Sequence, residues 1–130
     1  MTTTKLFLIK ALWGVEEIDQ DKSKWPALFQ RIKSEGFDAV ETHGVYFTQK
    51  AFVEEIKKSK LELIAQIHTS SVIDKGSKGF RYMTSRSVQV HVESLKTIGL
   101  LAKQAGAKMI NAHSGVDSWS NKQVCNCFVS

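Results

Sequence analysis

The sequence predicts a single α/β domain in which parallel strands alternate with helices. Short apolar segments of strand-like composition alternate with segments whose apolar residues have helical spacing. Residues 35–43 and 105–113 also repeat one kind of joint, in which a glycine ends a helix and the chain enters a short strand. Strands separated by helices in this way are parallel and joined by right-handed crossovers. Open sheets and closed barrels share this pattern.

The first half of the chain predicts two strands and one helix. A strand is expected over residues 5–12, followed by a polar loop over residues 14–24. A helix then begins near Pro26, and Gly36 supplies the left-handed conformation that ends it. A second strand is expected over residues 37–41. The apolar stripe that identifies the helix consists of Trp25, Leu28, Phe29 and Ile32.

The second half predicts two more helices and two more strands. Thr48 is expected to cap a helix, and a strand follows over residues 61–67. The longest connection covers residues 69–87. A long helix then runs from residue 88 to Gly106, and the fourth strand covers residues 108–112.

Composition limits the classes of protein to consider. With 130 residues and 42% apolar residues, the chain has room for one core. The net charge is +5, but the lysines alternate with glutamates, as in residues 54–58, which is ordinary for exposed helix faces, so basicity alone does not predict a nucleic-acid partner and we expect none. Cys125 and Cys127 are badly spaced for a mutual disulfide, so we expect a reducing, cytoplasmic location. No segment is apolar for long enough to predict a membrane span.

Histidines close two of the predicted strands. His68 follows the third strand and His113 follows the fourth. Because the carboxyl ends of parallel strands share one edge, where ligands bind in α/β folds, we expect both rings at one rim. Two imidazoles beside carboxylates can begin a site for zinc, manganese or iron, whereas the alternative is that each histidine only forms hydrogen bonds at its strand end. The same rim is expected to carry Trp13, Gly14, Glu41, His43, Ser114 and Asp117.

Three further features have competing interpretations. The connection over residues 69–87 is basic and could hold an anionic substrate, but a solvated, flexible loop is the commoner explanation for this composition. Trp13 could stack on a sugar face or pack at the rim. His91, within the last predicted helix, is interpreted as a structural or surface residue.

Several short motifs resemble the sugar isomerase/epimerase family, whose members have a xylose-isomerase-like TIM barrel. The resemblance covers residues 5–120, and the most specific motif is INAHSGVDSW at residues 110–119. It implies the N-terminal half of a (β/α)8 barrel, with four parallel strands and three crossover helices, over residues 1–120. Residues 121–130 form a divergent tail in this interpretation. The other motifs are ALWG at 11–14, FDAVE at 37–41, IHTS at 67–70 and HVESL at 91–95.

The resemblance assigns roles to the rim residues. It implies that His68 and His113 bind a divalent metal (Mn, Mg, Co or Zn), that Glu41 is the catalytic acidic residue, and that Trp13 and Asp117 bind substrate. The family's later metal-binding carboxylates have no counterpart in this sequence, so we expect an incomplete site. The substrate would be a small sugar or sugar derivative, isomerised or epimerised with metal assistance.

Half of a barrel has structural and functional consequences. Four strands with helices on one side are expected to expose an apolar inner face and two open edges, which would favour self-association. Two other functions stay open. One is a metal-dependent endonuclease acting at abasic DNA, and the other is a non-catalytic binding fragment.

Overall fold

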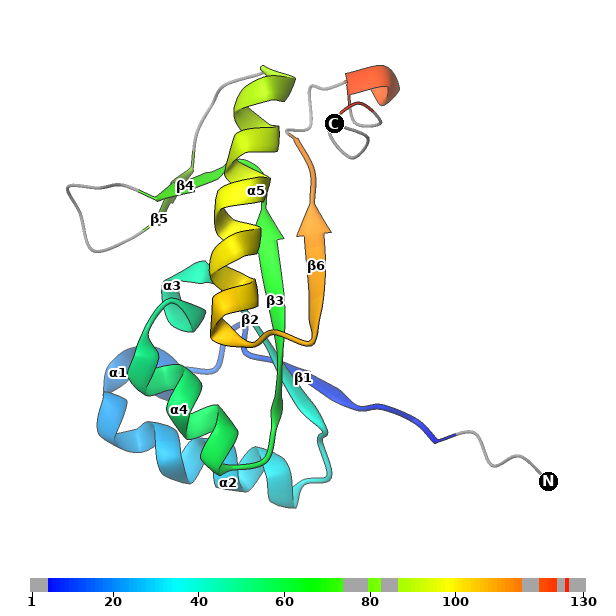
Figure 1. Cartoon of the computed structure of the whole chain (residues 1–130). Coiled ribbons are helices and arrows are strands. Elements are labelled where there is room, and N and C mark those ends of the chain that lie inside the picture. Colours follow the sequence, from blue (N-terminus) through cyan, green and yellow to red (C-terminus); the bar gives the residue numbers. More distant parts are fainter. Residues whose placement is uncertain (1–4, 74–79, 83–86, 116–119, 124–125, 127–130) are drawn as a thin grey trace.

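A computed structural model of the chain describes residues 5–73, 80–82, 87–115, 120–123 and 126. Its centre is a parallel sheet of four strands in the order β1-β2-β3-β6 (Figure 1). The other two described strands, β4 and β5, form a separate antiparallel pair. The strands are β1 (Ile9–Ala11), β2 (Ala39–His43), β3 (Glu62–His68), β4 (Ser71–Ile73), β5 (Phe80–Tyr82) and β6 (Met109–His113).

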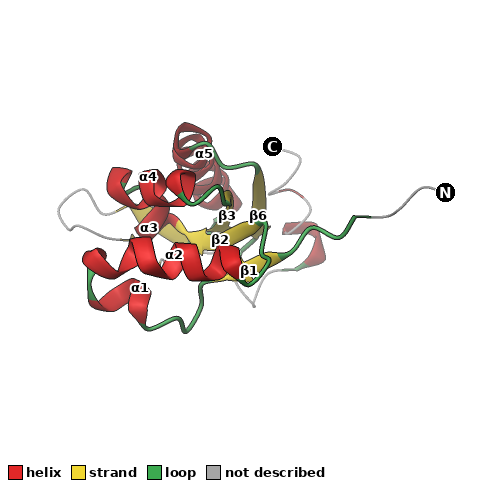
Figure 2. Ribbon diagram, turned by 90° about the horizontal axis from the view of Figure 1, so that it is seen from below, coloured by secondary structure: helices red, strands yellow, loops and turns green. Residues whose placement is uncertain are grey.

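Helices connect the successive strands of the parallel sheet. Because the strand order follows the chain order, right-handed crossovers place these helices on the same side of the sheet. Figure 2 shows α2, α4 and α5 together on that side. The helices are α1 (Glu17–Gln20), the 3-10 turn η1 (Lys22–Lys24), α2 (Trp25–Ser34), α3 (Gly44–Phe47), α4 (Lys50–Lys58) and α5 (Val88–Ala105).

Helix α2 illustrates how the sequence specifies a local element. Pro26 lies in its first turn, where the missing N–H has no cost, and Gly36 follows the helix at a φ of +93°. The predicted apolar stripe is buried against α4, where the ring of Phe52 packs edge-on against two aromatic rings of α2. The prediction of this helix and of its glycine stop is confirmed.

The main core lies between the helices and one face of the sheet. Val40, Ala65 and Ile67 point from the strands into this layer and are buried. Phe29 and Phe52 meet them from the helices. The predicted α/β architecture with four parallel strands and intervening helices is therefore confirmed.

Several predicted boundaries were wrong. β1 is shorter than expected and covers only Ile9–Ala11, although the preceding residues stay extended. The expected strand over residues 37–41 is displaced by two residues to Ala39–His43. Its start is delayed because Asp38 bonds to Leu8, with its side chain accepting a hydrogen bond from the Leu8 N–H.

Three connections contain more regular structure than predicted. The polar loop over residues 14–24 contains α1 and η1. Thr48 does not cap α4, because its hydroxyl donates instead to the Gly44 carbonyl and closes α3, and Gln49 precedes α4. The long connection over residues 69–87 contains the β4–β5 pair. These short elements lack the apolar periodicity that reveals longer ones.

The face of the sheet opposite α2, α4 and α5 is partly apolar and exposed, as expected for a half-barrel, and partly polar. Ile9 and Met109 are exposed at its two edges. Toward the carboxyl ends of the strands, however, this face carries polar side chains, four of which are joined by hydrogen bonds, Gln66 to His113 and Asn111 to Glu41. The polar side chains are Glu41 and His43 on β2, Gln66 and His68 on β3, and Asn111 and His113 on β6. In the part of the chain that the structure describes, no helix has the length and apolarity that a membrane span requires.

Candidate functional site

The register of the parallel sheet brings the strand-end side chains together. His68 pairs with His113 across β3 and β6, and His43 pairs with Gln66 across β2 and β3. Side chains alternate between the two faces of a strand, so residues two apart, such as Gln66 and His68, share a face. The helix side of these strands is taken by apolar residues, which leaves the polar side chains on the opposite face.

The imidazoles of His68 and His113 stack on each other. Their ring centroids are 4.6 Å apart and their planes are inclined by 11°. Trp13 adds a third ring, since its indole meets His68 edge-on at 6.2 Å between centroids. The two histidines that the sequence places at one rim are therefore in direct contact.

The side chain of Gln66 links Trp13 to His113. The Trp13 Nε1–H donates to Gln66 Oε1 over 2.8 Å, although the indole itself is 54% exposed. The Gln66 amide nitrogen lies 3.4 Å from His113 Nε2, a long contact in which the amide is the donor. The buried amide of Gln66 thus orients both the ring of His113 on β6 and the indole of Trp13, which follows β1.

Glu41 faces the same side from β2 and is held by an amide from β6. Asn111 Nδ2 donates to Glu41 Oε1 over 2.8 Å, and this bond crosses β3. The carboxylate is partly buried. An amide bond of this kind fixes the orientation of a carboxylate and leaves its second oxygen for a substrate hydroxyl.

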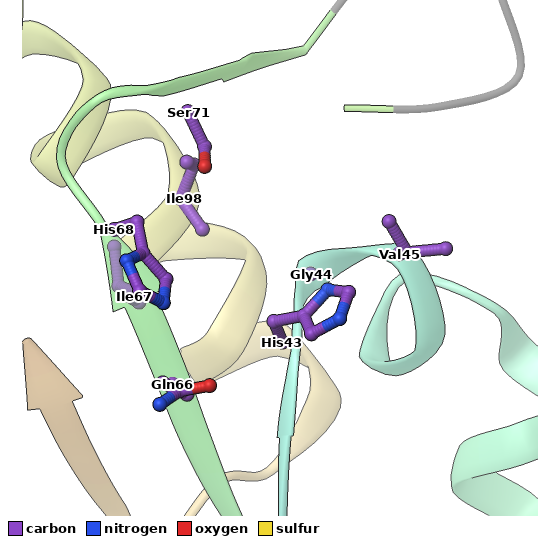
Figure 3. Close-up of a pocket in the computed structure, with 8 residues that line it drawn as sticks. All are labelled: His43, Gly44, Val45, Gln66, Ile67, His68, Ser71 and Ile98. Atoms are coloured by element: carbon purple, nitrogen blue, oxygen red, sulfur yellow. The ribbon is translucent and has the colours of Figure 1, made fainter. Parts of the chain in front are cut away.

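A pocket of about 190 Å³ opens between the ends of β2 and β3. Figure 3 shows His43 and His68 on its two sides, with Ile98 of α5 behind them. The ring of His43 also contacts Trp13, at 5.5 Å between centroids, and Tyr46, at 5.4 Å. The Tyr46 hydroxyl donates in turn to Asp19. The remaining lining residues are Gly44, Val45, Gln66, Ile67 and Ser71.

Burial keeps two of these imidazoles uncharged at neutral pH. Desolvation lowers the pKa of His43, opposed by the nearby negative charge of Asp19. Desolvation also lowers the pKa of His68, and the positive charges that His113 and His43 can acquire lower it further. A neutral imidazole offers one donor and one acceptor nitrogen, which suits hydroxyl ligands and proton transfer.

The stacked arrangement does not fit a metal ion shared by His68 and His113. The lone pair of an imidazole nitrogen lies in the ring plane, and two stacked planes inclined by 11° do not meet within ligand distance. Within the described residues, no cluster of three or more histidine, cysteine, aspartate or glutamate side chains has the geometry to hold an ion. Metal binding by this pair would require one ring to leave the stack.

The structure brings Trp13, His68 and His113 into one group, and it places Glu41 on the same face. Asp117 lies outside the described residues, as do Lys75, Lys78 and Arg86 of the basic connection. Gln66 and Asn111 were not predicted as site residues. The signal that could have revealed them is alternation, because each is a polar residue two positions before a strand-end histidine.

Comparison with known proteins gives no family assignment. No protein-family model matches the chain, and no curated protein matches it. The function must therefore be argued from the residues at the rim.

Proposed function

We propose that the carboxyl edge of the sheet binds a small sugar or sugar derivative, as part of an isomerase or epimerase site. The observation that carries the proposal is the pocket lined by His43, Gln66 and His68, whose rings and amide are in contact with the exposed indole of Trp13. Sugars present hydroxyl groups, which pair with amides and imidazoles, and an apolar ring face, which stacks on aromatic side chains. The motif resemblance supports the same class of ligand.

The chemistry proposed for this site is proton transfer between adjacent carbons. A base removes the proton next to the carbonyl, the bonding electrons form an enediol, and a proton returns to the neighbouring carbon. Glu41, held by Asn111, orients the substrate and is the carboxylate available as that base. Neutral His68 can pass protons between the sugar oxygens, because its pKa lies below the ordinary value. No step in this scheme requires an ion held by both stacked histidines.

Binding is tested by titrating the protein with aldoses and ketoses while following the histidine ring signals by NMR. We expect saturable shifts of the His43, His68 and His113 signals, with a dissociation constant of about a millimole per litre or below. Gln66→Leu should weaken binding about tenfold, because it removes the amide that orients Trp13 and His113. The matched control is Gln104→Leu, because Gln104 is exposed and lies at the C-terminal end of α5. Absence of any saturable shift would refute the proposal.

Catalysis is tested separately by incubating the protein with a bound sugar in D2O. An enediol mechanism exchanges the carbon-bound proton with solvent, so its NMR signal should disappear with time. Glu41→Gln should slow this exchange at least about a hundredfold if Glu41 is the base. Glu54→Gln, on the exposed face of α4, should leave the rate unchanged. Saturable binding without exchange would instead favour the non-catalytic binding function.

A further inference from the structure

One buried threonine joins the segments that follow the two stacked histidines. Thr69 comes directly after His68, and its N–H donates to the His113 carbonyl over 2.9 Å. Its Oγ1 accepts a hydrogen bond from the Gly115 N–H at 2.7 Å. Thr69 is fully buried. Thr69, which follows His68, thus holds both the backbone of His113 and the turn that follows His113.

His91 supports this threonine from α5. His91 is fully buried, and its Nδ1 lies 3.0 Å from Thr69 Oγ1. Because the Gly115 N–H already donates to that oxygen, the hydroxyl proton of Thr69 can be directed at His91 Nδ1. With Nδ1 as acceptor, the His91 ring completes a chain of hydrogen bonds from α5 to Gly115.

A second buried contact lies one turn further along the same helix. The Ser94 hydroxyl donates to the Ser71 carbonyl, and both residues are buried. Helix α5 is therefore attached at two points to the segment that follows His68. These contacts lie beyond the last pair of the ladder between β3 and β6, which is His68 with His113. Beyond this pair, one backbone bond from Thr69 and the side-chain bonds of Thr69, His91 and Ser94 position the backbone.

We propose that His91 and Thr69 are positioning residues that set the stacking of His68 and His113. Two rings stay stacked only if their backbones keep a fixed relative orientation, and here Thr69, the covalent neighbour of His68, bonds to the His113 carbonyl and to the Gly115 N–H. His91 fixes the Thr69 hydroxyl, and through it the Gly115 N–H. The helix that follows β3 along the chain thus determines the geometry of the rim, without touching a substrate.

The test is an NMR measurement on the full chain without ligand. Stacked rings shift each other's ring-proton signals, and a bonded amide exchanges slowly with solvent. We expect Thr69→Val to move the His68 and His113 ring signals toward those of free histidine and to speed exchange of the Gly115 amide about tenfold. Thr69→Ser, which keeps the hydroxyl, should retain both properties. Thr48→Val removes another threonine hydroxyl bond, the one to Gly44, and should leave the stacked rings unchanged.

Variants of His91 give an independent version of the test. An asparagine at this position can place a polar group near the site of Nδ1, whereas a leucine cannot. We therefore expect His91→Asn to keep the stacked-ring signals and His91→Leu to lose them, and this comparison decides the matter if Thr69→Val does not fold. Unchanged ring signals in a folded Thr69→Val variant would overturn the proposal. Equal effects of Thr69→Val and Thr69→Ser, or of His91→Asn and His91→Leu, would also overturn it. An accompanying loss of sugar affinity is expected only if the proposed function is correct. The change in the ring signals is expected whether or not the protein binds a sugar.

Discussion

Single residues at the rim show how the environment changes the chemistry of a side chain. His43 and His68 are ordinary histidines in the sequence, yet partial burial among rings lowers the pKa of each. Gln66 is an ordinary polar residue in the sequence, yet it is buried and contacts two rings. The chemical character of this rim is therefore a property of residues in contact.

The lowered pKa values predict that stability decreases in mild acid. The unfolded chain has histidines of ordinary pKa, about 6.5, so below that pH it binds more protons than the folded chain. The free energy of unfolding should therefore be constant near pH 8 and should fall from about pH 7 to pH 5. Urea unfolding at several pH values measures this. His68→Gln should flatten the slope, whereas an equal slope in the variant would show that other groups are responsible.

The stacked histidines also predict weak metal binding. Because their lone pairs do not converge, we expect the protein to take up Zn²⁺ or Mn²⁺ no more tightly than His68→Ala does, as measured by calorimetry. Uptake of one ion per chain that is abolished by both His68→Ala and His113→Ala would contradict this expectation. It would also show that one ring leaves the stack, and that His68 and His113 bind metal as the motif resemblance implies.

At the scale of elements, the C-terminal ends of α2 and α5 were the most predictable features. Gly36 and Gly106 follow α2 and α5 at φ values of +93° and +79°, where side chains other than hydrogen are disfavoured. In contrast, strand boundaries shifted from the prediction, by as much as four residues at the start of β1. A short strand starts where its partner allows pairing, and that partner is distant in sequence.

Substitution of two glycines, one inside α5 and one directly after it, should change the stability in opposite directions. Gly106→Ala should lower the free energy of unfolding by about 1 kcal/mol, because alanine is strained at a positive φ. Gly99 lies inside the helix, and a Cβ there would meet Ile110 Cδ1 at 4.0 Å, an ordinary contact. Gly99→Ala should therefore raise stability by up to about 1 kcal/mol. Chemical unfolding of both variants tests the pair, and destabilisation by Gly99→Ala would contradict the packing of α5 against Ile110.

At the scale of the whole molecule, two features of the sheet favour contact with another chain. Among the described strands, β1 pairs only with β2 and β6 pairs only with β3, so each keeps one open edge. Large apolar side chains are exposed along both edges, including Ile9 on β1 and Met109 on β6. Since all four strands are parallel, the β6 edge of one copy has the polarity needed to pair with the β1 edge of a second.

We therefore expect concentration-dependent self-association. Sedimentation velocity over a range of concentrations should show a rising average sedimentation coefficient. Ile9→Asp and Met109→Asp should each weaken association about tenfold or more, because each places a charge in the contact. Val90→Asp, at an exposed position on α5, is the matched control. A monomer at all concentrations, with a cooperative thermal transition, would contradict the expectation.

The sequence by itself determined the alternation of strands and helices, their parallel direction and the presence of two histidines at one rim. These follow from local periodicity, from glycine stops and from the handedness of crossovers, all of which are encoded within short segments. Only the tertiary structure decided that His68 and His113 stack, that Gln66 and Asn111 connect three strands, and that His91 contacts Thr69. Those contacts depend on strand register and on the placement of α5. Both are fixed by packing between residues far apart in the chain, and local patterns do not contain that information.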